Sequence, residues 1–126
     1  MTVLIDSWAW IEFFQGTMAG KVVSRHIDSD QDLIISAINL AEVYRWILRY
    51  YDESVAEDKK CAMMDRCTLI NVEEDIAVDA AWIRHTLKWG LGDSIVYATA
   101  KREGAKVLTG DSDFTGKEGV LFIDRP

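Results

Sequence analysis

The sequence predicts an α/β protein, a three-layer sandwich around a central, mostly parallel sheet of five strands. The first observation behind this is a set of five short apolar runs, each of a length typical of a buried strand. The second is that longer segments with helix-like apolar spacing separate most of these runs, and parallel strands need such crossover connections. The third is the length of 126 residues, which suits a single domain covering 1–126.

The N-terminal part of the chain predicts one strand and two helices. Thr2–Ile5 is a run of β-branched and aliphatic residues, as expected for a strand that is buried on both faces. Trp8–Gln15 predicts the helix that follows it. Gly16–Gly20 predicts a turn, because glycine readily ends a helix, and Lys21–Ile27 predicts a second, short helix.

The middle of the chain predicts two strands and the helices between them. Leu33–Ile35 is a second buried strand, which ends at Ser36, a residue type that caps helices well. The helix expected over Ala37–Tyr51 has an apolar face with residues three and four positions apart. Asp52–Arg66 predicts a further helix with a weaker apolar stripe, and Thr68–Ile70 predicts the third strand.

The last part of the chain predicts two helices and two strands. The acidic run Glu73–Asp75 opens a helix, since the N-terminal end of a helix favours negative charge. A final helix is expected over about Asp93–Glu103, ended by Gly104, the residue type that most easily adopts a left-handed conformation. Lys106–Thr109 and Val120–Ile123 complete the set of strands.

Five acidic residues are expected to gather at one edge of this sheet. Asp6 directly follows the first strand, and Asp111 and Asp113 directly follow the fourth. Glu42 and Asp93 lie near the starts of helices that leave one parallel strand or lead into the next, which places them at the carboxyl edge. Ligands and catalytic groups of parallel sheets gather beyond this edge. The topology therefore predicts an acidic site built from separate chain segments.

Each acid also has a purely structural explanation, and the sequence alone leaves these alternatives open. Taken singly, an acid at a helix start or turn more often bonds to the backbone than takes part in a reaction. The alternatives are a helix cap for Asp6 or Ser7, an ion pair between Glu42 and Arg45, a helix cap for Asp93, and turn stabilisation by Asp111 and Asp113.

Taken together, the acids favour a metal site. Several carboxylates above a low-dielectric sheet repel one another and raise each other's pKa unless a cation is bound. Oxygen ligands alone suit Mg²⁺ or Mn²⁺ rather than zinc. Such an ion activates water and stabilises charge on a phosphate, which removes the need for a histidine base. We therefore interpret His26 and His85 as surface or packing residues.

The composition limits the classes of function. The formal net charge of −7 argues against a broad basic face for nucleic acid, so phosphate must be contacted locally, with Arg45 and Arg49 as candidates. The N-terminus lacks the features of a secretory signal and no apolar run is long enough to span a bilayer, which predicts a cytoplasmic location. Cys61 and Cys67 are too few for a disulfide framework, and we expect reduced packing residues.

Four motifs together resemble the PIN-domain family, in particular the small VapC-type ribonuclease toxins of toxin-antitoxin pairs. Each motif is short, but their order and spacing extend over nearly the whole chain. The motifs are Leu4-Ile5-Asp6-Ser7, Ser36-Ala37-Ile38-Asn39-Leu40-Ala41-Glu42-Val43, Gly92-Asp93-Ser94-Ile95-Val96-Tyr97-Ala98 and Leu108-Thr109-Gly110-Asp111-Ser112-Asp113-Phe114.

This resemblance implies a metal-dependent endoribonuclease, usually a homodimer, which a small antitoxin protein inhibits by occupying or crowding the acidic pocket. The substrate it implies is RNA, and the cofactor is Mg²⁺ or Mn²⁺. In this pattern the principal metal ligands are Asp6 and Asp93, the pocket is completed by Glu42 and Asp111, and the supporting positions are Asn39, Thr109 and Asp113.

Two other functions stay open on sequence alone. One is a non-cutting module that uses the PIN scaffold to bind a partner or RNA. The other is a Mg-dependent phosphatase of another α/β family, such as the haloacid-dehalogenase-like proteins. This alternative is weakened because those proteins have an Asp-x-Asp pattern after the first strand, whereas Asp6-Ser7-Trp8 supplies only one acid.

Aromatic residues on two helices predict an interface, because such side chains are favoured at protein contacts and exceed what one small core readily buries. The partner is either a second copy of the chain or an antitoxin, and the alternative is that most of these rings are simply core. The residues are Trp8, Trp10, Phe13, Phe14, Trp46, Tyr50 and Tyr51.

Overall fold

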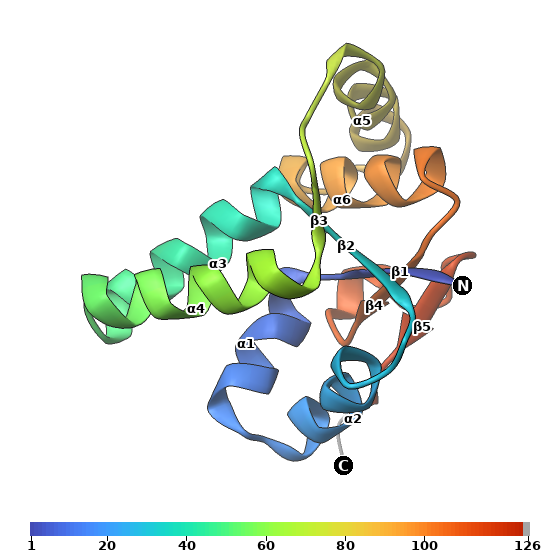
Figure 1. Ribbon diagram of the computed structural model, residues 1–126. Helices are drawn as coiled ribbons and strands as arrows, with labels where there is room; N and C mark the ends of the chain where they lie inside the picture. Colours follow the sequence, from blue (N-terminus) through green and yellow to red (C-terminus); the bar gives the residue numbers. More distant parts are fainter. Residues whose placement is uncertain (125–126) are drawn as a thin grey trace.

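The structure, a computed structural model, describes residues 1–124 and confirms the predicted α/β class (Figure 1). Its sheet has five strands in the order β3-β2-β1-β4-β5, and every neighbouring pair is parallel. The sheet is therefore wholly parallel, where the sequence predicted a mostly parallel one. The strands are β1 (Thr2–Ile5), β2 (Asp32–Ser36), β3 (Thr68–Ile70), β4 (Lys106–Thr109) and β5 (Val120–Phe122).

The helices agree closely with the predicted segments, with one correction. The turn predicted over Gly16–Gly20 is shorter, because the Thr17 hydroxyl accepts a hydrogen bond from the Gly20 backbone and starts a helix at Met18. The helices are α1 (Ser7–Gln15), α2 (Met18–Ile27), α3 (Ala37–Tyr50), α4 (Glu53–Arg66), α5 (Glu74–Leu87), α6 (Leu91–Arg102) and the short 3-10 helix η1 (Ser112–Phe114).

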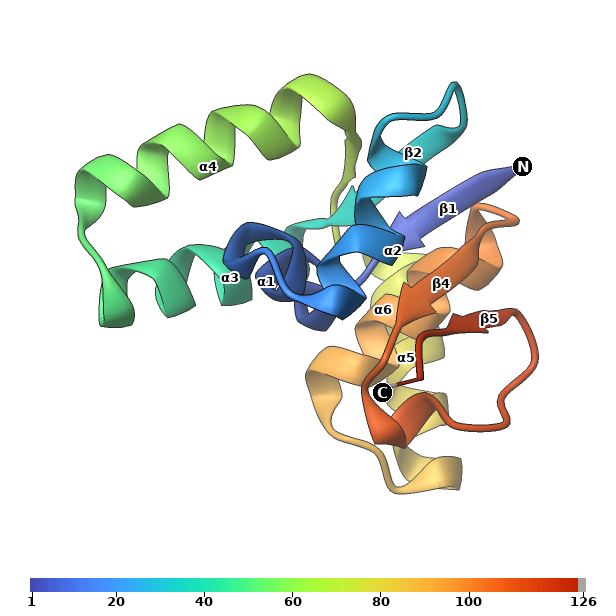
Figure 2. The ribbon, with the colours of Figure 1, turned by 90° about the horizontal axis from the view of Figure 1, so that it is seen from below.

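Alternation along the central strand separates the two faces of the sheet. Val3 and Ile5 of β1 pack into a core shared with α1 to α4, whereas Leu4 belongs to the core beneath α6. All three side chains are fully buried, which explains the uninterrupted apolar run. Figures 1 and 2 show α1 and α2 on one side of the sheet and α5 and α6 on the other, with α3 and α4 paired and extending away from it.

The register of the central strands sets the position of the first acid. Ile5 of β1 pairs with Leu108 of β4, and the Asp6 backbone N–H donates to the Leu108 carbonyl at 3.1 Å. Asp6 therefore leaves the sheet beside Thr109, the last residue of β4. Both lie at the carboxyl edge, where parallel sheets place their ligands.

The start of α3 lies at the same edge. Ser36 ends β2 and forms a capping box, in which its hydroxyl accepts from the Ile38 backbone N–H and Asn39 accepts from the Ser36 backbone N–H. This reciprocal arrangement satisfies backbone donors at the helix start and orients Asn39, which is fully buried. The strand-to-helix junction thus turns an amide side chain toward the sheet edge.

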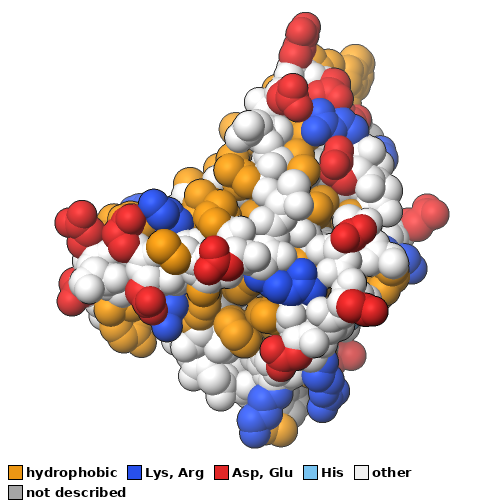
Figure 3. Space-filling model, viewed as in Figure 1, with side chains coloured by type: hydrophobic (Ala, Val, Ile, Leu, Met, Phe, Trp, Pro, Cys, Tyr) orange, Lys and Arg blue, Asp and Glu red, His pale blue; other side chains and the backbone are white. Residues whose placement is uncertain are grey.

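Acidic and basic side chains are scattered over several elements on the face drawn in Figure 3, and the acids do not form one large patch there.

The two cysteines differ from the prediction in one respect. Both thiols are free and Cys67 is buried, but Cys61 is exposed and does not serve packing. Among the helices described, none combines the length and apolar character that crossing a bilayer would need.

Candidate metal centre

Asp6 is the buried anchor of the site, with 4% of its surface exposed. Its Oδ2 accepts a hydrogen bond from the Thr109 hydroxyl at 2.8 Å, and its Oδ1 accepts from Asn39 Nδ2 at 3.2 Å. Asp6 occupies the N-cap position of α1, but its side chain makes no capping hydrogen bond. The capping alternative therefore does not account for the carboxylate, which instead has both oxygens fixed by two other chain segments.

A second set of contacts ties Glu42 to this anchor. Asn39 Nδ2 also donates to the Ser7 hydroxyl at 2.9 Å, and Ser7 in turn donates to Glu42 Oε1 at 2.7 Å. Glu42 is exposed on α3, and its bond is to Ser7 rather than to Arg45, the ion-pair partner that the sequence left open. The local sequence suggests a helix cap for Ser7 and gives no signal for this bridge between Asn39 and Glu42.

Three further acids lie close together beside α6. Asp93 in the first turn of α6 and Asp111 and Asp113 after β4 each place one carboxylate oxygen within 4.8 Å of the other two. Asp111 also accepts from the Asp113 backbone at 3.0 Å, so its expected turn contact exists alongside this cluster. The Thr109 hydroxyl accepts from the Asp111 backbone at 3.0 Å and links the cluster to Asp6.

The pKa values of two acids show how strongly the carboxyl groups are confined. Burial raises the pKa of Asp93 to about 8, and the nearby charge of Asp111 and a hydrogen bond with Asp113 add to this rise. Burial also raises the pKa of Asp6 to about 6, against the hydrogen bond from Thr109, which lowers it. Without a cation, the raised pKa means that the Asp93 carboxyl holds its proton to higher pH than an ordinary aspartate does.

Two glycines allow the acidic segments to approach. A β-carbon at Gly92 would lie 3.0 Å from Oε2 of Glu42, so this glycine brings the start of α6 against the Glu42 carboxylate, one residue before Asp93. A β-carbon at Gly110 would collide with the ring of Trp8, so glycine lets the loop after β4 pass over α1 without displacing that ring. Neither approach was predicted, because sequence pattern gives no signal for a contact between distant segments.

The arrangement fits a hard divalent cation. Within residues 1–124, the cluster that can hold an ion consists of carboxylates alone, and such oxygen ligands suit Mg²⁺ or Mn²⁺. Asp113, predicted as a supporting residue, belongs to this three-acid group, whereas Asp6 and Glu42 lie beside it. Burial and the neighbouring acids raise the pKa of Asp93, and a bound cation would lower it by stabilising the ionised carboxylate. His26 bonds to Gln31 and His85 is exposed on α5, so neither contributes to the cluster.

The candidate phosphate contacts lie next to Glu42. Arg45 and Arg49 line a hollow of about 280 Å³ on α3, together with Glu42, Trp46 and Tyr50. Arg49 lies over the Tyr50 ring at 5.4 Å from its centroid. Both arginines are exposed. The structure thus brings two cations to the rim of the acidic site.

Fold and site define an α/β protein with a group of acidic side chains at the carboxyl edge of a parallel sheet. The family model of the PIN domain matches residues 3–119, so the chain belongs to the PIN-domain family. PIN proteins of the VapC kind are nucleases, and the acid-only site agrees with that class. No curated protein matches the sequence.

Solved structures show the same fold. A toxin-antitoxin complex from Klebsiella pneumoniae is 26% identical, with 94% of this chain and 95% of that chain covered and a TM-score of 0.78. VapBC2 from Rickettsia felis, bound to a DNA fragment from its promoter, is 14% identical over 100% of both chains, with a TM-score of 0.78. Mycobacterium tuberculosis VapC20, a Sarcin-Ricin loop cleaving toxin, is 13% identical, with 97% and 89% covered and a TM-score of 0.69.

Proposed function

We propose that this protein is a divalent-metal-dependent endoribonuclease, the toxin of a toxin-antitoxin pair, whose PIN domain spans residues 1–126. The single observation on which this rests is the group of Asp93, Asp111 and Asp113, whose carboxylate oxygens lie within 4.8 Å of one another beside the buried Asp6. Membership of the PIN family also removes the support for a phosphatase of another α/β family.

In this proposal the acids hold Mg²⁺ or Mn²⁺, and Asp6 and Asp93 are the principal ligands. When bound, such an ion supplies a water of lowered pKa and positive charge for the attacked phosphate. Thr109 and Asn39 keep the Asp6 carboxylate in one orientation, so this side chain loses little conformational freedom when RNA binds. Ser7 holds Glu42 at the rim, where its free oxygen faces the start of α6.

Proton release is an expected companion of metal binding. The pKa of Asp93 is about 8 without metal, so its carboxyl must lose a proton before it can act as an ionised ligand. Metal affinity is therefore expected to rise with pH up to about 8. Isothermal titration of Mn²⁺ in buffers of different ionisation enthalpy measures the released protons. Binding without proton release at neutral pH would contradict the assignment of Asp93 as a ligand.

The proposed partners are a small antitoxin and a second copy of the chain. Tyr50 and Tyr51, at the far end of α3, are each 59% exposed, and both rings pack beside Trp46. An exposed aromatic group of this kind is typical of a protein interface, whereas Trp10 is buried and belongs to the core. Solved relatives are complexes of toxin with antitoxin. Sedimentation tests the homodimer, and a monomer at high micromolar concentration would contradict it.

Cleavage of RNA by the purified protein, with Mg²⁺ or Mn²⁺ and with EDTA, tests the proposal directly. Asp6→Asn and Asp93→Asn preserve size but remove ligand charge, and both are expected to abolish metal binding and cleavage while the fold persists. Asp65→Asn, an exposed acid on α4, is the matched control and keeps full activity. Full activity of either site variant, or equal cleavage in EDTA, would contradict the proposal. RNA binding without cleavage would favour the non-cutting module.

A further inference from the structure

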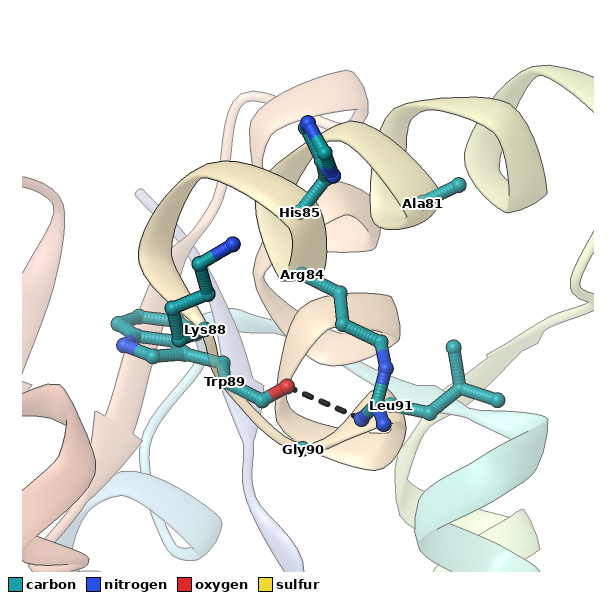
Figure 4. Close-up of a pocket in the computed structure, with 7 residues that line it drawn as sticks. All are labelled: Ala81, Arg84, His85, Lys88, Trp89, Gly90 and Leu91. Carbon is teal, nitrogen blue, oxygen red and sulfur yellow. Dashed lines mark hydrogen bonds between the residues drawn. The ribbon is translucent and has the colours of Figure 1, made fainter.

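A second hollow, of about 690 Å³, lies where α5 ends and α6 begins (Figure 4). Its charged residues are Arg84 and Lys88, with His85 beside them, and its apolar lining includes Trp89 and Leu91. We call it the α5–α6 hollow. Figure 4 shows Arg84 reaching toward the loop before α6, while His85 and Lys88 project from the end of α5. Its volume lies within the range of about 300–1,000 Å³ that is usual for ligand sites.

The positive charges of this hollow are not neutralised by neighbours. Arg84 donates to the Trp89 carbonyl at 3.0 Å, which fixes the guanidinium but leaves its charge uncompensated. Among the described residues, the ion pairs involve Lys59, Lys60 and Arg102, and none includes Arg84 or Lys88. No acid lines the hollow. In a chain with a net charge of −7, this concentration of cations favours an anionic ligand.

Helix stability explains only part of this arrangement. Arg84 and His85 lie in the last turn of α5, where positive charge interacts favourably with the helix dipole. That effect gives no reason for a concave site, nor for Lys88, which lies beyond the helix in a left-handed conformation with φ of 60°. Glycine is the usual residue in that conformation, because a β-carbon is unfavourable there. The lysine thus adds a cation at a position where backbone geometry prefers no side chain.

The segment that lines the α5–α6 hollow leads directly into the acidic site. Leu91 in its wall precedes Gly92, which lies against Glu42, and Asp93 follows. On the other side, the Trp89 ring packs against Phe114, the residue after Asp113, with centroids 5.0 Å apart. Residues of the basic hollow and a residue of the acid group, Asp93, therefore lie within one short segment.

We propose that the α5–α6 hollow binds backbone phosphates of the RNA strand next to the bond that is cut. This rests on the proposed ribonuclease function. Carboxylates repel phosphates, so an RNA strand held over the acid group needs neighbouring cations whose charge the acids do not neutralise. Arg84 and Lys88 supply them, and Lys117, whose Nζ lies 5.7 Å from the centroid of the Trp89 ring, adds a third at the edge. Base identity plays no part in these contacts, so they contribute affinity rather than sequence preference.

Salt-dependent RNA binding tests the proposal separately from cleavage. The probe is a labelled single-stranded oligouridine in which methylene groups replace the bridging phosphate oxygens, so it keeps its charge but is not hydrolysed. In Mg²⁺, Arg84→Gln/Lys88→Gln is expected to bind about tenfold more weakly at physiological salt and to lose about 1.4 from the slope of log K against log salt. Lys106→Gln, an exposed lysine at the opposite edge of the sheet, is the control and leaves both unchanged.

The outcomes separate this proposal from the proposed function. Loss of affinity in the double variant but not in Lys106→Gln supports the hollow even if the protein never cuts RNA. The proposal would be overturned if the double variant bound RNA as tightly as the unmodified protein does, or if the double variant and Lys106→Gln lost affinity equally. It would also be overturned if the unmodified protein showed no measurable RNA binding. Unchanged RNA binding with an altered sedimentation coefficient would instead assign the hollow to a contact between two copies. Thermal melts verify that the double variant remains folded.

Discussion

Replacing Asp6 by asparagine is expected to stabilise the protein when no metal is bound. Asp6 is 4% exposed, and burial raises the pKa of its carboxyl from 3.8 to about 6, although hydrogen bonds from Thr109 and the Ser7 backbone favour the charged form. The folded state holds this proton more tightly than the unfolded chain does, so ionising Asp6 weakens folding. The difference between 3.8 and about 6 corresponds to roughly 3 kcal/mol.

The sign of the pH dependence follows from this raised pKa. Below pH 3.8 the carboxyl of Asp6 is protonated in both states and there is no penalty. Between pH 3.8 and about 6 the unfolded chain releases its proton first, so the free energy of unfolding falls as pH rises. Above about pH 6 the whole penalty is present. Asparagine removes it but loses one accepted hydrogen bond, of about 1 kcal/mol, which leaves about 2 kcal/mol of net stabilisation.

Thermal unfolding in EDTA measures this effect. For a domain of this size, about 2 kcal/mol raises Tm by about 8 °C, and this rise is expected near pH 8 but not near pH 4. Saturating Mg²⁺ is expected to reverse the order, because it stabilises only the protein whose folded state binds it. Asp65→Asn, on the exposed side of α4, serves again as the control. A Tm for Asp6→Asn that is equal or lower near pH 8 in EDTA would refute the reasoning.

Three further predictions concern the pocket, the thiols and the substrate. In Gly92→Ala the new methyl lies 3.0 Å from Oε2 of Glu42 and displaces that carboxylate, so the rate of RNA cleavage is expected to fall. In a Glu42→Gln background the same substitution should cause no additional loss of cleavage rate. Alkylation followed by mass spectrometry should modify exposed Cys61 and spare Cys67, whose pKa burial raises to about 11, and equal modification would contradict this. Fluorescence titration should show non-hydrolysable RNA binding more tightly in Mg²⁺ than in EDTA, since bound metal reduces repulsion by the acids; equal affinities would contradict this.

The central strands could be predicted from sequence because their side chains are buried on both faces of the sheet, whereas the edge strand Thr68–Ile70 is largely exposed and was predicted from its short apolar run alone. Thr2–Ile5, Thr68–Ile70 and Lys106–Thr109 have the bounds that their apolar or β-branched runs predict. The start of α2 was less predictable, since the glycines after α1 suggested a longer turn while Thr17 caps the helix earlier. Local apolar runs thus predicted elements well, and a single side-chain hydrogen bond shifted one boundary.

The acidic site was predictable only as far as it follows strand ends. Asp6 comes directly after β1 and Asp111 comes two residues after the end of β4, so topology alone brings them to one edge. The hydrogen bond between Ser7 and Glu42 joins residues 35 positions apart, and nothing in either local sequence indicates it. The basic hollow was not predicted either. Its cations lie at the end of a helix rather than after a strand, and its concave shape comes from the packing of α5 against α6.

The central place of β1 has a consequence for how the protein is made. The ribosome produces β1 first, but its neighbour β4 begins at Lys106, so one edge of the first strand has no native partner during most of synthesis. A nascent chain that stops before Leu108 has neither the Leu108 contact that orders Asp6 in the finished sheet nor two of the three clustered acids. Under the proposed function, the growing chain therefore cannot attack RNA on its own ribosome until the last strands have left the exit tunnel and folded.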